Sequence, residues 1–267
     1  MKDKILKLSF IPLLINLYFP IFADDSSQFG HPLRIEPAGI YNKVRFNGSY
    51  TETRTKSSFE KDKNASIEGE LIFLQKFSLK VNGGATKYET VGEKTVVQND
   101  RWNTTLKFAS ESGGNNFRLV WGGGVRVSDK QKVENPRYDI APDLYLLRPN
   151  LSLGVGFGIF EIQADLSMQT ETNSKFKESN NQDFRRFYQA GGLFSAKFGN
   201  LRLIAETEYR QPYDSKVDVR SRFWNVYPGI SYNIFDKTMI SLSAQIPVNG
   251  ESGELGKGFR FSLFQFF

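Results

Sequence analysis

Charged side chains recur at every second position along many segments of this chain. In residues 201–210, four of the five even-numbered positions are charged, whereas the odd-numbered positions are apolar or uncharged. Ammonium, guanidinium and carboxylate groups in such rows can bind counter-ions and steer charged solutes. The basic members of these rows are Lys43, Arg45, Lys80, Arg101, Lys107, Arg118, Arg126, Arg148, Arg185, Lys197, Arg202, Arg210 and Arg260, and the acidic members are Glu68, Glu70, Glu161, Asp165, Glu206 and Glu208.

The signs of these charges are segregated along the chain. Basic residues dominate positions 43–148 and return at Arg260, positions 161–165 and 206–208 are acidic, and Glu68 and Glu70 interrupt the basic set. Many charges in the middle of strands are difficult to bury in a dry core and indicate a water-filled lumen. With thirteen cations and six anions, such a lumen would carry a charge near +7 and attract anions. The alternative is that the charges pair with neighbouring strands, which gives a plugged lumen without ion preference.

The sequence offers little for catalysis. Its only histidine, His31, precedes the first expected strand, and the chain has no cysteine. A general base on a barrel strand and a His/Cys metal cluster are therefore not expected. We predict a protein that is not an enzyme and uses no cofactor and no metal. Nucleic acid is not an expected partner, despite a pI near 9.3, because the basic residues line strands and do not form one exposed patch.

The elements that position the charged rows are predicted to be β-strands. Residue type alternates with a period of two after residue 37, and no period of 3.6 is sustained. Pro228 predicts a bulge or a local break, because proline cannot donate to a sheet ladder. About twelve strands are expected, at residues 40–50, 65–73, 78–88, 101–108, 117–127, 144–157, 160–170, 184–197, 201–210, 222–233, 238–246 and 258–267.

The connections between these strands alternate in length. Short connections are expected at residues 74–77, 158–159, 198–200 and 234–237, with a slightly longer one at 109–116. Long polar stretches lie between them, at residues 51–64, 89–100, 128–143, 171–183, 211–221 and 247–257. This pattern predicts an all-β, up-and-down antiparallel transmembrane β-barrel of about 12 strands, with short periplasmic turns and long extracellular loops.

In most strands, the positions that alternate with the charged ones are apolar, as expected for a face in contact with lipid. Aromatic residues gather near strand ends and predict belts at both bilayer interfaces. Phe73, Phe77, Phe157, Phe160, Phe198, Phe235 and Phe267 lie by the short turns, and Trp102, Tyr188, Tyr209 and Trp224 lie nearer the long loops.

The last strand places Phe259, Phe261, Leu263 and Phe267 on one face and resembles the last strand of bacterial outer-membrane barrels. That resemblance implies that these four residues are the signal read by the barrel-assembly machinery.

The first residues have the pattern of a secretory signal peptide. Lys2, Lys4 and Lys7 precede a mostly apolar run that ends at Ala23. The alternative is an uncleaved membrane anchor, but prolines interrupt the run and no stop-transfer pattern follows. We expect a signal peptide at residues 1–23, a periplasmic segment at residues 24–37 and the barrel at residues 38–267.

In architecture the chain resembles the monomeric twelve-stranded porins that take up acidic oligosaccharides, the oligogalacturonate and sialic-acid channel family. The likeness is in length, strand count, basic arcs, the ending at residues 259–267 and the stretch at residues 204–210. It implies a monomeric channel in the bacterial outer membrane that contacts lipid and lets small anionic solutes diffuse, acidic oligosaccharides among them. The alternative is a non-conducting structural or adhesion barrel that acts through its extracellular loops.

Overall fold

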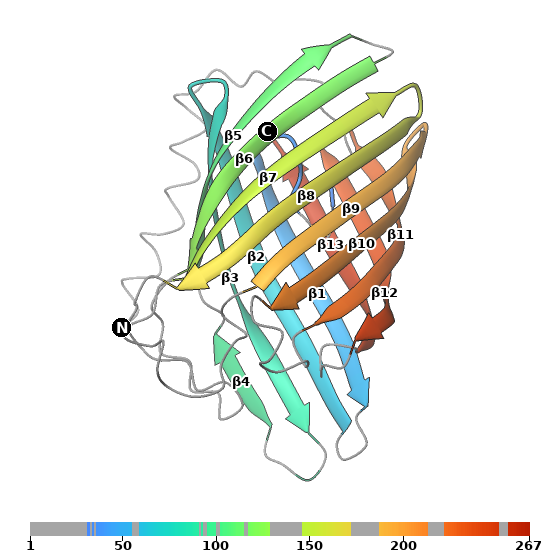
Figure 1. Cartoon of the computed structure of the whole chain (residues 1–267). Coiled ribbons are helices and arrows are strands. Elements are labelled where there is room, and N and C mark those ends of the chain that lie inside the picture. Colours follow the sequence, from blue (N-terminus) through green and yellow to red (C-terminus); the bar gives the residue numbers. More distant parts are fainter. Residues whose placement is uncertain are drawn as a thin grey trace, which may run out of the picture.

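The computed structural model describes residues 31, 32, 34, 36–54, 59–90, 92, 95–99, 102–114, 117–128, 146–171, 187–212, 222–250 and 256–267. Within these residues the chain forms thirteen strands, and twelve of them close into an antiparallel barrel (Figure 1). The strands are β1 Lys43–Arg54, β2 Phe59–Phe73, β3 Phe77–Thr90, β4 Val96–Asn99, β5 Asn103–Gly113, β6 Phe117–Ser128, β7 Leu146–Phe157, β8 Phe160–Glu171, β9 Phe187–Phe198, β10 Leu201–Pro212, β11 Phe223–Phe235, β12 Thr238–Gly250 and β13 Lys257–Phe266.

Pairing between the first and last strands closes the barrel. The ladder between β1 and β13 runs from Lys43↔Phe266 to Glu52↔Lys257, and the other barrel strands pair in chain order, with β5 following β3. The up-and-down barrel predicted from the sequence is therefore confirmed. The remaining strand, β4, pairs with the end of β3 at residues 85–88 and lies beyond the barrel wall (Figure 1). The sequence predicted only a loop there, at residues 89–100.

The predicted short turns all lie at one rim of the barrel, together with the carboxyl terminus (Figure 1). Gly158 and Gly199 adopt φ values of 54° and 59° in two of them, a conformation that costs glycine little. At the opposite rim the predicted loop at residues 51–64 is wrong, because β1 reaches Arg54 and β2 begins at Phe59. The two strands pair to their ends, so their backbone groups are satisfied beyond the barrel. Four of the other predicted long loops lie mostly outside the described residues. The ranges that are not described there are 129–145, 172–186, 213–221 and 251–255.

The outer face of the barrel is apolar. Large hydrophobic side chains point outward at alternate positions, and Leu151 and Leu166 on paired positions of β7 and β8 are 69% and 61% exposed. Such an exposed apolar surface is far larger than water-soluble proteins tolerate and fits contact with lipid. Among the described residues, no helix is long and apolar enough to cross a membrane.

Exposed aromatic rings lie near both rims, as predicted. By the short turns, the rings of Phe73 and Phe77 lie 6.0 Å apart, and those of Phe157 and Phe160 lie 5.7 Å apart. Trp102 directly precedes β5 and Tyr188 is the second residue of β9, so their exposed rings lie nearer the opposite rim. These positions agree with two interfacial belts.

The predicted irregularity at Pro228 is also present. On the β12 side, the ladder passes from Val226↔Ile246 to Gly229↔Ser243 and omits the pairs at residues 227 and 228. On the β10 side, Pro228 keeps its place opposite Ala205. A formal register shift occurs nearby, between Trp224 and Asn225. Proline therefore interrupts one ladder and leaves the barrel closed.

Candidate functional site in the barrel interior

The charged rows found in the sequence face the interior of the barrel. The most enclosed members, with at most 9% of their surface exposed, are Lys43, Arg45, Lys80, Lys107 and Arg202 among the cations, and Glu68, Glu70, Glu161, Asp165, Glu206 and Glu208 among the anions. Arg118, Arg126, Arg148, Lys197, Arg210 and Arg260 are partly buried. The apolar residues between them point outward, so the predicted strand parity is correct. Arg101 and Arg185 lie outside the described residues.

The described residues between His31 and β1 also lie inside the barrel. We name residues 31–42 the internal segment, of which 33 and 35 are not described. Its described residues contact strands all around the wall: Glu36 contacts β3, β5 and β6, Ala38 contacts β8, Arg34 contacts β10, and His31 contacts β13. One short segment reaches all of these strands only from the lumen. The part of the predicted periplasmic segment from residue 31 onward therefore contacts the interior wall.

Glu36 is the main anionic contact of the internal segment. Its carboxylate accepts a hydrogen bond from Lys80 Nζ at 2.6 Å and one from Arg126 Nη2 at 3.0 Å, and it lies 3.1 Å from Lys107 Nζ. Burial alone would raise the pKa of Glu36, but the charges of Lys80, Lys107 and Arg126 hold it well below its ordinary value. Lys107 Nζ also donates to the carbonyl oxygens of Pro37 and Gly39, at 3.0 and 2.9 Å.

Arg34 binds the acidic side of the lumen. Its backbone N–H donates to Glu206 Oε1 at 2.7 Å, and its guanidinium pairs with Glu208, whose side chain is fully buried. Both carboxylates belong to β10, which lies across the barrel from the strands that hold Glu36. The internal segment thus bridges the two charge walls that the sequence predicted.

Aromatic rings enclose the beginning of the internal segment near the short-turn rim. The His31 ring lies 4.3 Å from the Tyr41 ring, 4.7 Å from Phe266 and 5.4 Å from Phe264, measured between centroids. Burial, followed by the charge of Lys43, holds the pKa of His31 well below its ordinary value, so the imidazole is neutral. Its Nδ1 atom has no hydrogen-bond partner among the described residues. The sequence placed His31 outside the barrel, whereas the structure places it in the lumen among rings.

Several interior charges pair with charges on nearby strands. Lys43 Nζ of β1 lies 3.1 Å from Glu70 and 3.4 Å from Glu68 of the neighbouring β2, and Arg202 of β10 pairs with Glu161 of β8, across the intervening β9. The alternative considered from the sequence, that charges on neighbouring strands pair with one another, therefore holds for the group on β1 and β2. These pairs are almost fully enclosed by protein.

A different arrangement holds three arginines further toward the long-loop rim. Arg148, Arg210 and Arg260 come from β7, β10 and β13, and each lies over an aromatic ring. The distances from guanidinium carbon to ring centroid are 5.6 Å for Arg148 over Phe187, 4.2 Å and 4.8 Å for Arg210 over Phe187 and Phe223, and 5.4 Å for Arg260 over Tyr227. Contacts of this kind orient a cation without cancelling its charge. We name these three residues the mouth arginines.

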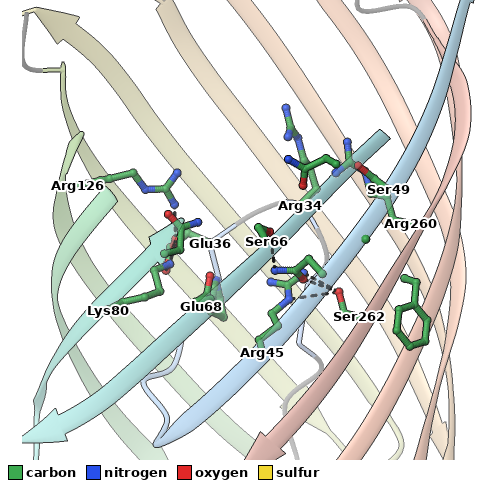
Figure 2. A pocket seen from close by; sticks show the side chains of 16 residues that line it. Arg34, Glu36, Arg45, Ser49, Ser66, Glu68, Lys80, Arg126, Arg260 and Ser262 are labelled. Atoms are coloured by element: carbon green, nitrogen blue, oxygen red, sulfur yellow. Dashed lines mark hydrogen bonds and ion pairs between the residues drawn. The ribbon is translucent and has the colours of Figure 1, made fainter. Parts of the chain in front are cut away.

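A polar cavity of about 200 Å³ lies beside the internal segment (Figure 2). Glu36, Lys80 and Arg126 line one side of it, and Arg45, Arg260 and Ser262 line the side formed by β1 and β13. This space is large enough for several water molecules or a small solute. It connects the cation set around Glu36 with one of the mouth arginines.

Sequence reasoning identified the wall charges but missed the internal segment. Arg34 and Glu36 lie outside any alternating pattern, so nothing marked them as lumen residues. The rings of Phe187, Phe223 and Tyr227 were also missed as partners of the mouth arginines. Their period-two placement on the same parity as the polar residues of their strands was the available signal.

Comparisons with known proteins show the fold. No family model and no curated protein matches this sequence. An outer membrane channel from Pseudomonas putida F1 has 11% sequence identity and a TM-score of 0.66, and the match covers 90% of this chain and all of that one. The NanC porin, at 7% identity, and the KdgM porin, at 10%, each match 84% of this chain and 99% of their own, with TM-scores of 0.52 and 0.50. The chain therefore has the twelve-stranded barrel fold of these outer-membrane channels.

Proposed function

We propose that this chain is an outer-membrane channel of the porin type, which lets small hydrophilic solutes diffuse and prefers anions. The observation that carries the proposal is the excess of cations on the interior wall. Of the wall residues predicted from the sequence, eleven basic and six acidic ones are described, a net charge of +5. The internal segment adds Arg34 and Glu36, one of each sign, and so leaves this excess unchanged.

The mouth arginines are the residues that would confer the preference. Many other interior cations lie against carboxylates, whereas Arg148 and Arg260 form no ion pair within the described part of the chain. Arg148 contacts the hydroxyl of Ser167 at 2.9 Å, and Arg260 contacts the amide oxygen of Gln245 at 3.0 Å. Their positive potential extends into the lumen over about one screening length, roughly 8 Å at physiological salt. An anion entering from the long-loop rim would meet this potential first.

Small sugar acids are the solute class that this lumen would suit. They combine hydroxyl groups with a carboxylate, and the cavity wall offers serine and asparagine side chains beside its cations. A solved structure of the KdgM porin contains oligogalacturonate, a chain of sugar acids. We extend that solute class to this channel as part of the proposal.

The proposed location is the bacterial outer membrane, reached after removal of the signal peptide at residues 1–23. Outer-membrane lipid would surround the apolar outer face. The barrel-assembly machinery would recognise the last strand through Phe259, Phe261, Leu263 and Phe267. A single chain closes the barrel by pairing β1 with β13, which is consistent with a monomer.

Planar-bilayer conductance under a salt gradient tests the function. The reversal potential of the purified protein should show anion preference, and replacing Arg148 and Arg260 together with alanine should move it toward zero. Lys76→Ala is the matched control, because Lys76 is an exposed cation in a short turn, away from the lumen. Cation preference in the wild-type protein would refute the assignment. Failure to conduct under every condition would favour the non-conducting structural or adhesion barrel.

A further inference from the structure

We propose that Lys80, Lys107 and Arg126 form a carboxylate-binding site in which the chain's own Glu36 is the resting occupant. An incoming carboxylate solute displaces Glu36, and the internal segment then leaves the path through the lumen. This inference rests on the proposed channel function and adds to it a site, a ligand class and a means of control.

The geometry around Glu36 is that of a binding site for an anion. Three cations from the adjacent strands β3, β5 and β6 converge on one carboxylate, at 2.6 to 3.1 Å. Glu68 also acts on Lys80, so two carboxylates face these three cations, and the site keeps a net positive charge that attracts a further anion. Charge-assisted hydrogen bonds of this kind are the strong ones available to a protein for holding a carboxylate.

The site is also accessible to a solute from the lumen. Lys80 and Arg126 both line the cavity of about 200 Å³, and Glu36 forms part of the same wall (Figure 2). A carboxylate in this cavity would therefore reach two of the three cations while Glu36 still held its place. Exchange of one carboxylate for the other keeps the cations paired throughout, which avoids leaving a buried charge alone.

The internal segment is held in a way that allows release. Its residues from 36 to 42 belong to no strand ladder, and among the described residues its backbone forms hydrogen bonds mostly with side chains. Arg34 and Glu36 bridge opposite walls, so the segment crosses the lumen between two small cavities. Loss of the Glu36 contact removes the ion pairs of the segment with the basic wall. It leaves the hydrogen bonds from Lys107 to Pro37 and Gly39, the hydrogen bond from Ala38 to Gln163 and the contact of Arg34 with β10.

Single-channel recording of the full barrel tests the inference. The wild-type protein should have a low open probability that rises with D-galacturonate and not with D-galactose, an uncharged sugar of similar size. Glu36→Gln removes the carboxylate charge and should raise the ratio of open to closed states about tenfold without any sugar acid. It should also respond much less to D-galacturonate, because the occupant that the solute displaces is already released.

Glu68→Gln is the matched control. Glu68 lines the same cavity, pairs with Lys43 and also acts on Lys80, so its variant loses the same charge beside the same site. It belongs to the wall strand β2 and, among the residues that the structure describes, does not hold the internal segment. It should behave as the wild-type protein does. Equal opening in Glu36→Gln and Glu68→Gln would overturn the inference, because the effect would then follow from charge alone. Wild-type conductance equal to that of Glu36→Gln would also overturn it and leave the channel function standing. Absence of conductance in all variants would overturn the proposed function as well.

A disulfide lock provides a second measurement. The chain has no cysteine, so Ala38→Cys with Ala109→Cys introduces the only two thiols. These two alanines are buried in one cluster, where the internal segment packs against β5. Oxidation should abolish the response of this double variant to D-galacturonate, and reduction should restore it. An oxidised, cross-linked barrel that still opens would overturn the inference. This test does not depend on correct folding of the Glu36 variant.

Discussion

Arg34 and Glu36 lie two positions apart on the internal segment and bind opposite walls of the barrel, Arg34 at Glu208 of β10 and Glu36 at Lys80 of β3. The basic wall thus faces the acidic residue of the segment, and the acidic wall faces its basic residue. This complementarity fixes which side of the segment faces which strands. The internal segment thereby contacts three wall cations through Glu36 and two wall carboxylates through Arg34.

The two anchors are expected to differ in strength. Glu36 contacts three cations through its side chain, whereas Arg34 contacts Glu206 through its backbone and Glu208 through its side chain. Arg34→Gln should therefore open the channel less than Glu36→Gln does, because the backbone contact to Glu206 remains. Glu36→Asp keeps the charge on a shorter side chain and should restore part of the closed state. Open probabilities of the three variants check this order, and a larger effect of Arg34→Gln would contradict it.

The barrel itself could be predicted from the sequence because lipid and lumen leave a period-two record along every strand. Leu151, Leu166 and those wall charges that the structure describes are on the predicted faces. The position of the internal segment could not be predicted in this way. The contact between Glu36 and Lys80 joins residues 44 positions apart, and although Lys80 belongs to an alternating row, no periodicity marks Glu36.

The ends of the strands at the long-loop rim could not be predicted from the sequence either. Residues 51–64 are polar on both parities and were predicted as a loop, yet most of them lie in paired strands. Cross-strand ladders and surface contacts such as Lys63 to Glu89, at 3.2 Å, stabilise the hairpins where no lipid selects an apolar face. Hydrophobic alternation therefore marks the extent of the membrane better than the extent of a strand.

The buried group of Lys43, Glu68 and Glu70 predicts a large loss of stability on truncation of its cation. Lys43→Met would leave two enclosed carboxylates without their cation and should lower the free energy of unfolding by about 3–5 kcal/mol. Lys63→Met is the control, because its exposed pair with Glu89 should contribute less than about 1 kcal/mol. Urea unfolding of barrels folded into lipid vesicles measures both. Similar losses for the two variants would show that Lys43 is not desolvated as the structure indicates.

Because the outer face of the barrel is assigned to lipid, an arginine placed there should cost folding free energy within the membrane and little beyond it. Leu151→Arg lies in the middle of β7 and should cost about 2–4 kcal/mol of folding free energy in vesicles, because it exposes a charge to hydrocarbon. Val97→Arg is the control, since Val97 is equally exposed, at 67%, but lies on β4 beyond the barrel wall. It should change stability by less than about 0.5 kcal/mol. Equal costs at the two sites would argue against a lipid-facing belt at β7.

The buried imidazole of His31 predicts that acid loosens the internal segment. When the segment is docked, burial and the positive charges of Lys43 and Arg202 hold the pKa of His31 well below its ordinary value. When it is released into water, the pKa returns to about 6.5. Below pH 6.5 the released state therefore takes up a proton that the docked state does not, and docking weakens as pH falls by up to about 1.4 kcal/mol per pH unit.

Open probability should accordingly rise when the pH is lowered from 7.5 to 5.5. Glu36 does not oppose this change, because its own pKa lies well below the ordinary value and it remains charged throughout that range. His31→Phe keeps an aromatic ring against Tyr41 and Phe266 but cannot be protonated, so it should remove the pH response and preserve the closed state at neutral pH. A pH response that persists in His31→Phe would show that a group other than His31 makes the docking of the internal segment depend on pH.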